Sequence, residues 1–308
     1  MNIRPKIIFL GTPDFAVASL RALVDSGFEV VAVVTAPDKP AGRGLKLTEL
    51  AVKQYAVVRN IPVLQPLKLK DPEFLDQLKS FQADLQVVVA FRMLPELVWA
   101  MPPLGTINLH GSLLPQYRGA APINRAIMNG EEKTGVTTFK LKQEIDTGNI
   151  LLSEEIPIGP DETAGELHDR MKEKGAALVV KTIRGLTDGS LQEKPQDISS
   201  MGELKSAPKL FTADGEINWP DSIVKIHNQI RGLSPFPGAF TSLKGKNLKI
   251  FRSRPEKSEH HLLPGTVETD GKQWLRFSAA DGYIYAEEMQ WEGKKRLAVA
   301  DFLRGYRF

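Results

Sequence analysis

Two polar residues, Asn108 and His110, are the first candidates for chemistry in this sequence. They stand two residues apart in a short apolar run, so alternation along a strand places both side chains on the same face. The amide of Asn108 offers N–H donors to a developing oxyanion, and the imidazole of His110 can exchange a proton near neutral pH. The pair suits acyl transfer onto an amine, because the amine itself attacks and no covalent Ser or Cys nucleophile is required.

An isolated Asn-x-His at a strand end is more often structural, with the imidazole hydrogen-bonded to the backbone. The longer run around this pair, N-L-H-G-S-L-L-P-Q-Y-R-G-A-A-P-I, is more specific. It resembles the signature of the folate-dependent formyltransferases, and its continuation R-G-A-A-P-I (118–123) is most similar to the methionyl-tRNA formyltransferases within that family. The resemblance implies transfer of a formyl group from 10-formyltetrahydrofolate to the α-amino group of methionyl-initiator-tRNA, without a metal ion.

A third candidate, Asp146, lies in the turn E-I-D-T-G-N (144–149) between two expected strands. An Asp in this position is also a common turn former, whose carboxylate accepts hydrogen bonds from the backbone of its own turn. The D-T-G segment resembles the second catalytic element of the formyltransferases, in which the Asp approaches the His. The resemblance therefore implies a catalytic set made of Asn108, His110 and Asp146.

Two segments are expected to hold the folate donor. A buried strand over 85–91 ends in F-R-M-L-P, and in the family this segment helps to form the pterin pocket. Phe91 and Arg92 replace the more usual Tyr and Gly here, so only backbone contacts carry over unchanged. The S-L-L-P run after His110 supplies a hydroxyl and an apolar wall. The residues assigned to the cofactor are Phe91, Arg92, Met93, Ser112, Leu113, Leu114 and Pro115.

The segment A-P-D-K-P-A-G-R-G (36–44) is too rich in Pro and Gly to be predicted as helix or strand. It follows an expected strand and is predicted to be a long loop at the edge of the sheet where ligands bind. Composition alone favours a solvated loop. The methionyl-tRNA formyltransferases carry a P-A-G-R-G loop here that engages the acceptor end of the tRNA, which implies that Arg43 and Lys39 contact the substrate.

The C-terminal third holds the positive excess of the chain, whose net charge is +3. Its basic residues cluster over 244–257, where Glu256 is the only acid. Such a run is usually a solvated face, but on an OB-like barrel beside a formyltransferase domain it fits an RNA backbone better. The residues assigned to tRNA contact here are Lys244, Lys246, Lys249, Arg252 and Arg254.

The order of the expected elements predicts an α/β fold with a doubly wound, Rossmann-like sheet of parallel or mixed strands. Continuous apolar strands over 6–10 and 29–35 flank an amphipathic helix over 15–25, which is the pattern of a buried parallel sheet. Gly11 opens no G-x-G-x-x-G, so a dinucleotide site is disfavoured.

Composition changes along the chain predict two domains. A long amphipathic helix over 163–186, opened by a Thr163–Glu166 capping box, closes the first. A polar stretch without apolar periodicity follows, and then short, evenly spaced strands that suggest a small barrel. The predicted parts are a catalytic domain over 1–189, a linker or wrapping loop over 190–208, and an OB-like tRNA-binding β-barrel over 209–308.

The composition is that of a globular protein, with 42% hydrophobic and 25% charged residues in 308. The absence of cysteine excludes disulfides, cysteine–metal sites and thiol catalysis. The N-terminal apolar run is too short for a signal sequence or a membrane span. We therefore expect a cytoplasmic monomer with no membrane partner.

Three other functions compete with transfer to tRNA. A formyltransferase acting on a UDP-amino sugar stays open, because such enzymes share H-G-S-L-L-P and often have a second domain. Enzymes of glycinamide ribonucleotide resemble H-P-S-L-L-P and lack a second domain, so Gly111 and the C-terminal third disfavour them. A catalytically inert RNA-binding protein would not need Asn108, His110 and Asp146, yet all three are present.

Overall fold

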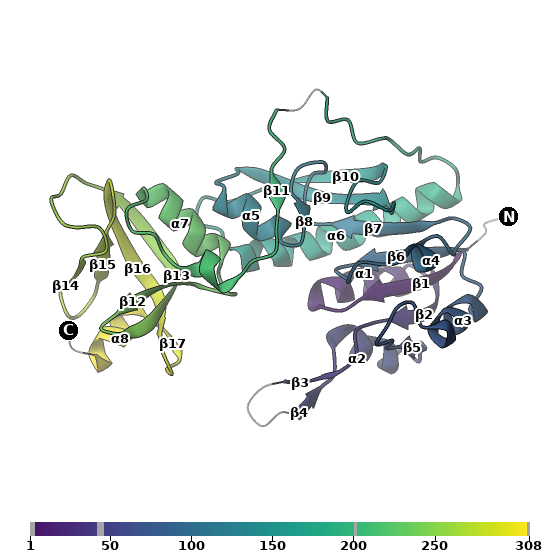
Figure 1. Cartoon of the computed structure of the whole chain (residues 1–308), viewed down its shortest axis with the longest axis horizontal. Coiled ribbons are helices and arrows are strands. Elements are labelled where there is room, and N and C mark those ends of the chain that lie inside the picture. Colours follow the sequence, from purple (N-terminus) through teal and green to yellow (C-terminus); the bar gives the residue numbers. More distant parts are fainter. Residues whose placement is uncertain (1–3, 42–45, 200–201, 307–308) are drawn as a thin grey trace. The chain divides into compact units, whose positions relative to one another are not determined.

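The computed structural model describes residues 4–41, 46–199 and 202–306, which form two compact units. The chain passes between the units several times, and each unit has its own sheet and core (Figure 1). The predicted domain boundaries stay a prediction. The first unit consists of Met1–Arg118, Gly135–Ile156 and Asp169–Lys205, and the second of Gly119–Thr134, Pro157–His168 and Ser206–Phe308.

The first unit is built on a seven-stranded sheet with the order β10-β9-β7-β6-β1-β2-β5. Strands β1, β2, β5, β6 and β7 pair in parallel, and β9 pairs with β7 in the antiparallel direction. The expectation of a doubly wound, mixed Rossmann-like sheet is confirmed. The strands are β1 (Lys6–Gly11), β2 (Glu29–Val34), β5 (Val63–Leu64), β6 (Leu85–Val89), β7 (Thr106–His110), β9 (Lys133–Lys140) and β10 (Ile150–Pro157).

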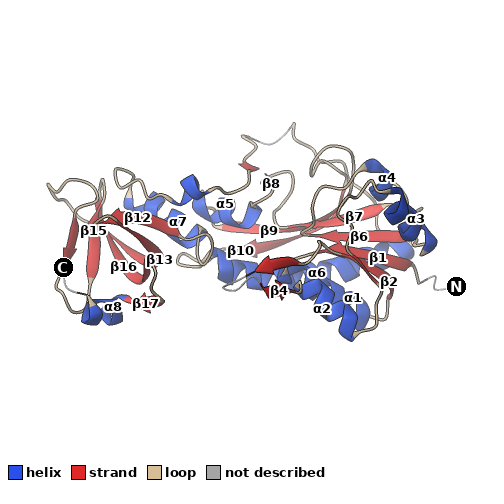
Figure 2. Cartoon of the chain, turned by 60° about the horizontal axis from the view of Figure 1, so that its bottom comes forward, coloured by secondary structure: helices blue, strands red, loops and turns tan. Residues whose placement is uncertain are grey.

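Helices cover both faces of this sheet (Figure 2). Apolar side chains of one face, such as Val88, form a core with Phe74 and Val98 of α3 and α4. On the other face, α6 lies so close to β7 that a Cβ on its Gly175 would stand 2.7 Å from Leu109. The helices are α1 (Asp14–Asp25), α2 (Ala51–Val58), α3 (Pro72–Ser80), α4 (Glu96–Trp99) and α6 (Ala164–Thr187).

The start of α6 has the predicted capping box. The carboxylate of Glu166 accepts the backbone N–H of Thr163 at 2.9 Å, and the Thr163 hydroxyl accepts the N–H of Glu166 at 3.3 Å. These reciprocal bonds satisfy donors that a helix start otherwise leaves open. In the part of the chain that the structure describes, no helix is both long and apolar enough to span a bilayer.

The second unit packs α7 against one face of a six-stranded antiparallel sheet with the order β12-β13-β16-β15-β14, and β17 beside β16. Among the described residues no ladder joins β14 to β12, so the predicted OB-like barrel is present as an open half-barrel. Its elements are α5 (Pro122–Met128), the 3-10 turn η1 (Thr212–Gly215), α7 (Ile223–Gly232), β12 (Ala239–Leu243), β13 (Lys246–Lys257), β14 (Val267–Thr269), β15 (Leu275–Ser278), β16 (Gly282–Trp291), β17 (Arg296–Ala298) and α8 (Val299–Gly305).

Two short ladders complete the fold. Strand β8 (Arg118–Gly119) pairs with β11 (Ser206–Ala207), and β3 (Lys39–Ala41) pairs with β4 (Lys46–Thr48). The prediction of a strand-free loop over 36–44 is therefore wrong at Lys39–Ala41, which form a strand. A two-stranded ribbon has only edge strands, and edges tolerate the missing N–H of a proline such as Pro40. The predicted tRNA contact Arg43 lies outside the described residues.

Candidate active site

Asn108 and His110 lie on one face of β7, at the carboxyl end where parallel sheets bind ligands. Because α6 covers Leu109 on the other face, both polar side chains point away from that helix. Asn108 is half-buried, and its amide makes no hydrogen bond to any residue the structure describes. An amide that bonds to no described residue keeps both of its N–H donors, so it is available to a bound substrate.

His110 is held by two groups on opposite sides of its ring and is only 6% exposed. Its Nε2 lies 2.8 Å from the backbone oxygen of Tyr117, and its Nδ1 lies 3.8 Å from Oδ2 of Asp146. A carbonyl oxygen can only accept, so Nε2 carries a proton and Nδ1 faces the carboxylate. The structure thus brings His110 and Asp146 together, while their catalytic roles stay a prediction.

The two residues that flank the imidazole have left-handed backbone conformations. Asp146 has φ of 55° and Tyr117 has φ of 58°. Asp tolerates this region, but a bulky aromatic residue rarely adopts it. The backbone N–H of Tyr117 donates to the oxygen of Lys205 at 2.6 Å, which helps to hold the conformation. Backbone strain of this kind is concentrated at functional sites, and here it aims a carbonyl at His110.

Gln196 connects the Asp146 turn to the segment that follows His110. Its amide nitrogen donates to the backbone oxygens of Asp146 and Gly148, each at 2.8 Å. Its amide oxygen accepts from the guanidinium of Arg118 at 3.1 and 2.6 Å. Gln196 lies in the stretch interpreted as a linker or wrapping loop, and nothing in the local sequence marked it as a functional residue.

The residues before Gln196 dock alongside β9 and β10. Lys194 exchanges two backbone hydrogen bonds with Ile150, at 2.7 and 2.8 Å. Glu193 lies 2.6 Å from the ammonium of Lys140 and accepts from the amide of Asn149 at 3.0 Å. Hydrogen bonding to Lys140 holds the pKa of the Glu193 carboxyl below its usual value, although partial burial opposes this effect.

The glycine of the D-T-G segment is required by the close approach of two backbones. A Cβ at Gly148 would lie 1.6 Å from the backbone oxygen of Lys140, a distance that no real contact allows. The Asp146 turn therefore folds directly onto the end of β9. This explains why a glycine stands two residues after the Asp.

A buried threonine shapes the S-L-L-P loop from the neighbouring strand. The hydroxyl of Thr137 on β9 donates to the oxygen of Ser112 at 2.7 Å and accepts the N–H of Leu114 at 3.3 Å. The Ser112 hydroxyl donates to the oxygen of Gln116 at 2.6 Å. Sequence analysis did not single out Thr137. The assignment of Ser112, Leu113, Leu114 and Pro115 to the cofactor stays a prediction.

The second predicted cofactor segment follows β6, which is the strand next to β7. Arg92 donates from its guanidinium to the backbone oxygens of Pro66 and Leu67, at 2.5 and 3.0 Å. These two hydrogen bonds connect the segment after β5 to the segment after β6. The side chain of Met93 is 75% exposed. The contacts of Phe91, Arg92 and Met93 with a folate stay a prediction.

The predicted tRNA residues of the second unit differ in their contacts. Arg252 pairs with Glu166, and Arg254 pairs with Glu256 at 3.0 Å. Lys249 instead donates from its Nζ to the oxygen of Pro237 at 2.7 Å. Lys246 is exposed, and Nζ of Lys244 lies 5.6 Å from the ring centroid of Tyr306. The remaining predicted residue, Lys39, belongs to β3 of the first unit.

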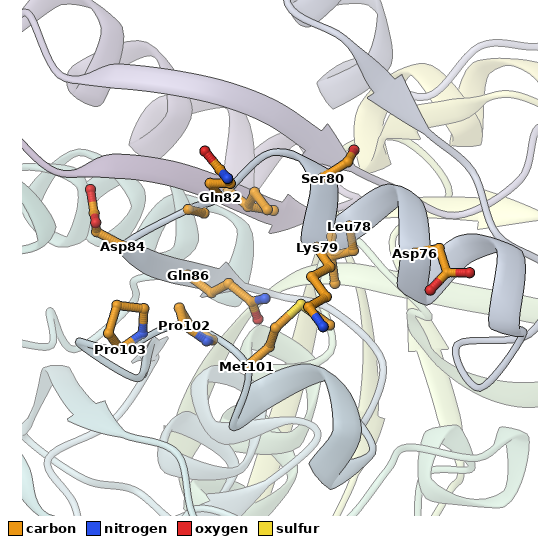
Figure 3. A pocket seen from close by; sticks show the side chains of 12 residues that line it. Asp76, Leu78, Lys79, Ser80, Gln82, Asp84, Gln86, Met101, Pro102 and Pro103 are labelled. Atoms are coloured by element: carbon orange, nitrogen blue, oxygen red, sulfur yellow. The ribbon is translucent and has the colours of Figure 1, made fainter.

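A separate pocket of about 590 Å³ lies at the amino-terminal edge of the first unit's sheet (Figure 3). Its lining includes Asp84 and Gln86 around the start of β6, and Met101 ahead of β7. Asn108 and His110 lie at the opposite end of β7, so this pocket is not the predicted folate site. Within the described ranges, no group of three or more His, Asp or Glu residues is placed to hold a metal ion.

Comparison with known proteins agrees with this geometry. The formyl transferase family model matches residues 5–183, and the model of the formyl transferase C-terminal domain matches residues 209–307. The methionyl-tRNA formyltransferase of Bacteroides fragilis is 48% identical over 307 residues, which cover 98% of this chain and 95% of that protein. The one of Azobacteroides pseudotrichonymphae is 51% identical over 311 residues, covering 98% and 96%.

Solved structures share the fold at lower identity. The sugar 3N-formyl transferase WlaRD has a TM-score of 0.68 at 21% identity and covers 95% of this chain and 100% of its own. The N-formyltransferase of Helicobacter canadensis has a TM-score of 0.65 at 23% identity, with 92% and 98% covered. The family models and the nearly full-length relatives together place this chain in the formyl transferase family, among the methionyl-tRNA formyltransferases.

Proposed function

We propose that this chain transfers the formyl group of 10-formyltetrahydrofolate to the α-amino group of methionyl-initiator-tRNA. The relatives that are about half identical over nearly their whole length carry this activity in their names. The observation that carries the proposal is the Asn108 amide, which bonds to no described residue, beside the His110–Asp146 pair at the carboxyl end of β7. This is the donor and proton-exchanging arrangement that formyl transfer to an amine needs.

A folate donor agrees with the family and with its solved members. WlaRD was crystallised with 5-N-formyl-THF, and the Helicobacter canadensis enzyme with folinic acid. In this chain the segments after β6 and β7 lie side by side, because Val88 and Val89 pair with Asn108 and Leu109. A folate between them would bring its formyl group to the face that carries Asn108. The donor is consumed in the reaction and is therefore a co-substrate.

The chemistry follows from the groups on that face. The α-amine attacks the formyl carbon, a C–N bond forms, and the carbonyl oxygen becomes an oxyanion. The Asn108 amide donates a hydrogen bond to this oxygen, which stabilises the tetrahedral intermediate more than the starting carbonyl. The bond from the formyl carbon to the folate nitrogen then breaks. A proton leaves the attacking nitrogen and one reaches the leaving nitrogen, so the net proton count is unchanged.

His110 and Asp146 are the titratable pair placed to manage that proton. Because Nε2 of His110 is committed to the Tyr117 oxygen, the ring is fixed in orientation and Nδ1 is the nitrogen directed at Asp146. A ring held in this way loses no orientational freedom when the substrate arrives. The loop from 36 to 44, with Lys39 and Arg43, and the basic residues of β13 are proposed to bind the tRNA.

The cellular setting follows from this reaction. Formylmethionyl-tRNA is used in translation initiation, so we infer that the chain works in the cytoplasm. We also propose that it acts as a monomer, because Asn108, His110 and Asp146 all belong to one unit of the chain. Sedimentation of the purified protein at working concentration should give the mass of a single chain, and a dimer would overturn this part.

The test is a formyl-transfer assay with 10-formyltetrahydrofolate and two acceptors, charged initiator tRNA and a UDP-amino sugar. We expect transfer to the tRNA alone, and a marked rise in the KM for tRNA in Arg43→Ala. Transfer to the sugar alone would keep the chemistry of Asn108 and His110 but overturn the acceptor. Transfer to neither would overturn the proposed function.

A further inference from the structure

The second unit contains a pocket of about 540 Å³ that the catalytic chemistry does not use. It is formed by the start of α5, the segment around η1, the turn between α7 and β12, and the start of β13. Its lining includes three phenylalanines, two lysines and two asparagines, and no carboxylate. We call it the Phe236 pocket. Its volume is within the range of small-ligand sites, and its charge is positive.

Two aromatic rings at this pocket are turned to solvent. Phe236 is 81% exposed and Phe211 is 64% exposed, although aromatic residues usually bury most of their surface. Phe236 stands between Pro235 and Pro237, whose rings fix their own φ angles and stiffen the turn that presents it. An exposed aromatic ring on a stiff turn is a platform for another flat, apolar surface.

The floor of the pocket is formed by closely packed backbone and one more aromatic ring. A Cβ at Gly215 of η1 would lie 3.1 Å from the ring of Phe240, so these two elements are in direct contact. The N–H of Gly238 donates to the oxygen of Leu233 at 2.9 Å and closes the turn that carries Phe236. The shape of the pocket is therefore fixed by contacts within the unit.

The cations of the pocket retain donors for an anion. Nζ of Lys249 gives one hydrogen bond to the oxygen of Pro237, and an ammonium has three protons. Nζ of Lys209 lies 5.9 Å from the ring centroid of Phe211. By contrast, Arg254 is paired with Glu256 nearby on the same strand. Neither Lys209 nor Lys249 forms an ion pair with a described residue, so both bring positive charge to the pocket.

A polar side chain at the rim supplies hydrogen bonds of both kinds. The backbone N–H of Asn247 donates to Glu292, but its side-chain amide makes no hydrogen bond to any described residue. An amide offers both donors and an acceptor, as the edge of a nucleobase does. Aromatic faces, an amide and two ammonium groups around one hollow match the base and the phosphate of a nucleotide.

We propose that the Phe236 pocket binds one unpaired nucleotide of the tRNA substrate, with the base on the Phe236 ring and a phosphate at Lys209 and Lys249. The inference rests on the proposed function in taking tRNA as the partner. A base inside a duplex is covered by its neighbours on both faces, so only an unstacked nucleotide can offer its face to Phe236. The pocket thus recognises a single-stranded position and not the helical backbone.

The first experiment compares the affinities of the full chain and its variants for uncharged initiator tRNA. Phe236→Ala removes the ring, and we expect the Kd to rise by roughly 5-fold to 150-fold. Phe236→Trp keeps an aromatic face and should bind like the wild type. Leu263→Ala is the matched control, because Leu263 is 80% exposed in the same unit and does not line the pocket.

Chemical probing of the tRNA 2′-hydroxyls provides the nucleotide-level readout. Wild type and Phe236→Trp should protect one unpaired nucleotide that Phe236→Ala leaves reactive. Equal affinity and equal protection in all variants would overturn the pocket even if formyl transfer proceeds. A wild type that binds tRNA through Phe236 but transfers no formyl group would instead overturn the proposed function. A chain that does not bind tRNA would overturn both.

The salt dependence of binding tests the two lysines. Each phosphate contact contributes about one unit to the slope of log Kd against log salt. Lys209→Gln and Lys249→Gln should each reduce the slope by about that amount. Lys272→Gln changes an exposed lysine of the same unit that does not line the pocket, and it should leave the slope unchanged. A slope that responds to Lys272→Gln but to neither Lys209→Gln nor Lys249→Gln would place the phosphate contact elsewhere and overturn the proposal.

Discussion

Residues 105–118 and 190–205 belong to the same unit and meet around His110, but only the first segment has a recognisable pattern. The first supplies Asn108 and His110, which lie on the face of β7 that is proposed to meet the substrate. The second supplies the side chain of Gln196 and the backbone of Lys205. Both hold in position the residues that face the imidazole. Both segments are needed to define the geometry of the site.

Several contacts of the second segment are made through its own backbone. Gln116 donates from its amide to the oxygen of Glu203 at 3.2 Å and accepts the N–H of Lys205 at 2.8 Å. The Tyr117 N–H donates to the Lys205 oxygen, so a side chain and a peptide group together extend a strand-like pairing. The peptide groups of 203 and 205 could belong to residues of many types.

The comparison explains why only one of the two segments has a recognisable motif. A group that meets the reacting atoms is restricted to a few residue types, so its neighbourhood becomes recognisable. A group that holds a carbonyl needs only an N–H at the right place, and most residues provide one. The absence of a pattern in 190–205 therefore reflects the chemistry of its contacts and not a lesser role.

The largest effect should follow from removing the donor in the first segment. Asn108→Ala removes the amide that bonds to no described residue, and loss of one oxyanion donor typically lowers kcat by ~10²–10³. Asn108→Asp keeps the size but offers no N–H, so it should be at least as impaired. Single-turnover kinetics on charged tRNA would measure this, with Kd for the tRNA unchanged. Activity within a factor of three of the wild type would remove Asn108 from the chemistry.

Much of the fold could be predicted from the sequence, because the apolar pattern of the strands agrees with their burial. Leu85 to Val89 are apolar except for Gln86 and lie in the middle of the sheet, as the pattern predicts. The capping box at Thr163 was also visible, since both partners lie within three residues. The His110–Asp146 approach came from family resemblance, and no spacing rule would have supplied it.

Contacts between distant residues with ordinary side chains were not accessible. Gln196 acts across 50 residues on Asp146, and Thr137 acts across 25 on Ser112, in both cases by bonding to a peptide group. The hairpin over Lys39–Thr48 was missed because Pro and Gly outweighed the weak strand signal on either side. Local sequence cannot reveal a partner that tertiary structure brings from elsewhere.

A smaller loss is expected from the second segment, through Gln196. Gln196→Leu removes the bonds to the Asp146 and Gly148 oxygens and leaves the Arg118 guanidinium without its acceptor. We expect kcat to fall about 10-fold with little change in either KM, because a misplaced carboxylate affects the reaction more than binding. The pH profile of kcat should also move, which a merely structural defect would not cause.

The control for this change is already in the chain. Gln192 stands four residues earlier, is exposed, and makes no hydrogen bond to a described residue, so Gln192→Leu should behave as wild type. Gln196→Glu keeps an acceptor for Arg118 but loses the donor to Asp146, and it should resemble Gln196→Leu. If Gln196→Glu were fully active, only the hydrogen bonds from Arg118 would be needed for activity. The role assigned to the amide nitrogen of Gln196 would then be wrong.

The smallest effect should be a dependence of the second segment's docking on pH. Lys140 lowers the pKa of Glu193, so the folded pKa lies below the unfolded value near 4.5. A group of this kind adds stability above the unfolded pKa and loses it as the pH falls through the folded pKa. The pair is partly exposed, so its contribution is under about 1 kcal/mol.

Hydrogen exchange can detect this contribution locally. The backbone N–H groups of Ile150 and Lys194 each donate to the carbonyl oxygen of the other residue, beside the ion pair. After correction for intrinsic exchange rates, the protection of these two amides should fall as the pH drops below about 4.5. In Glu193→Gln, protection should be slightly lower at neutral pH and lack this acidic step. Retention of the full step in that variant would show that another carboxylate, and not the pair with Lys140, ties residues 193–196 to the sheet.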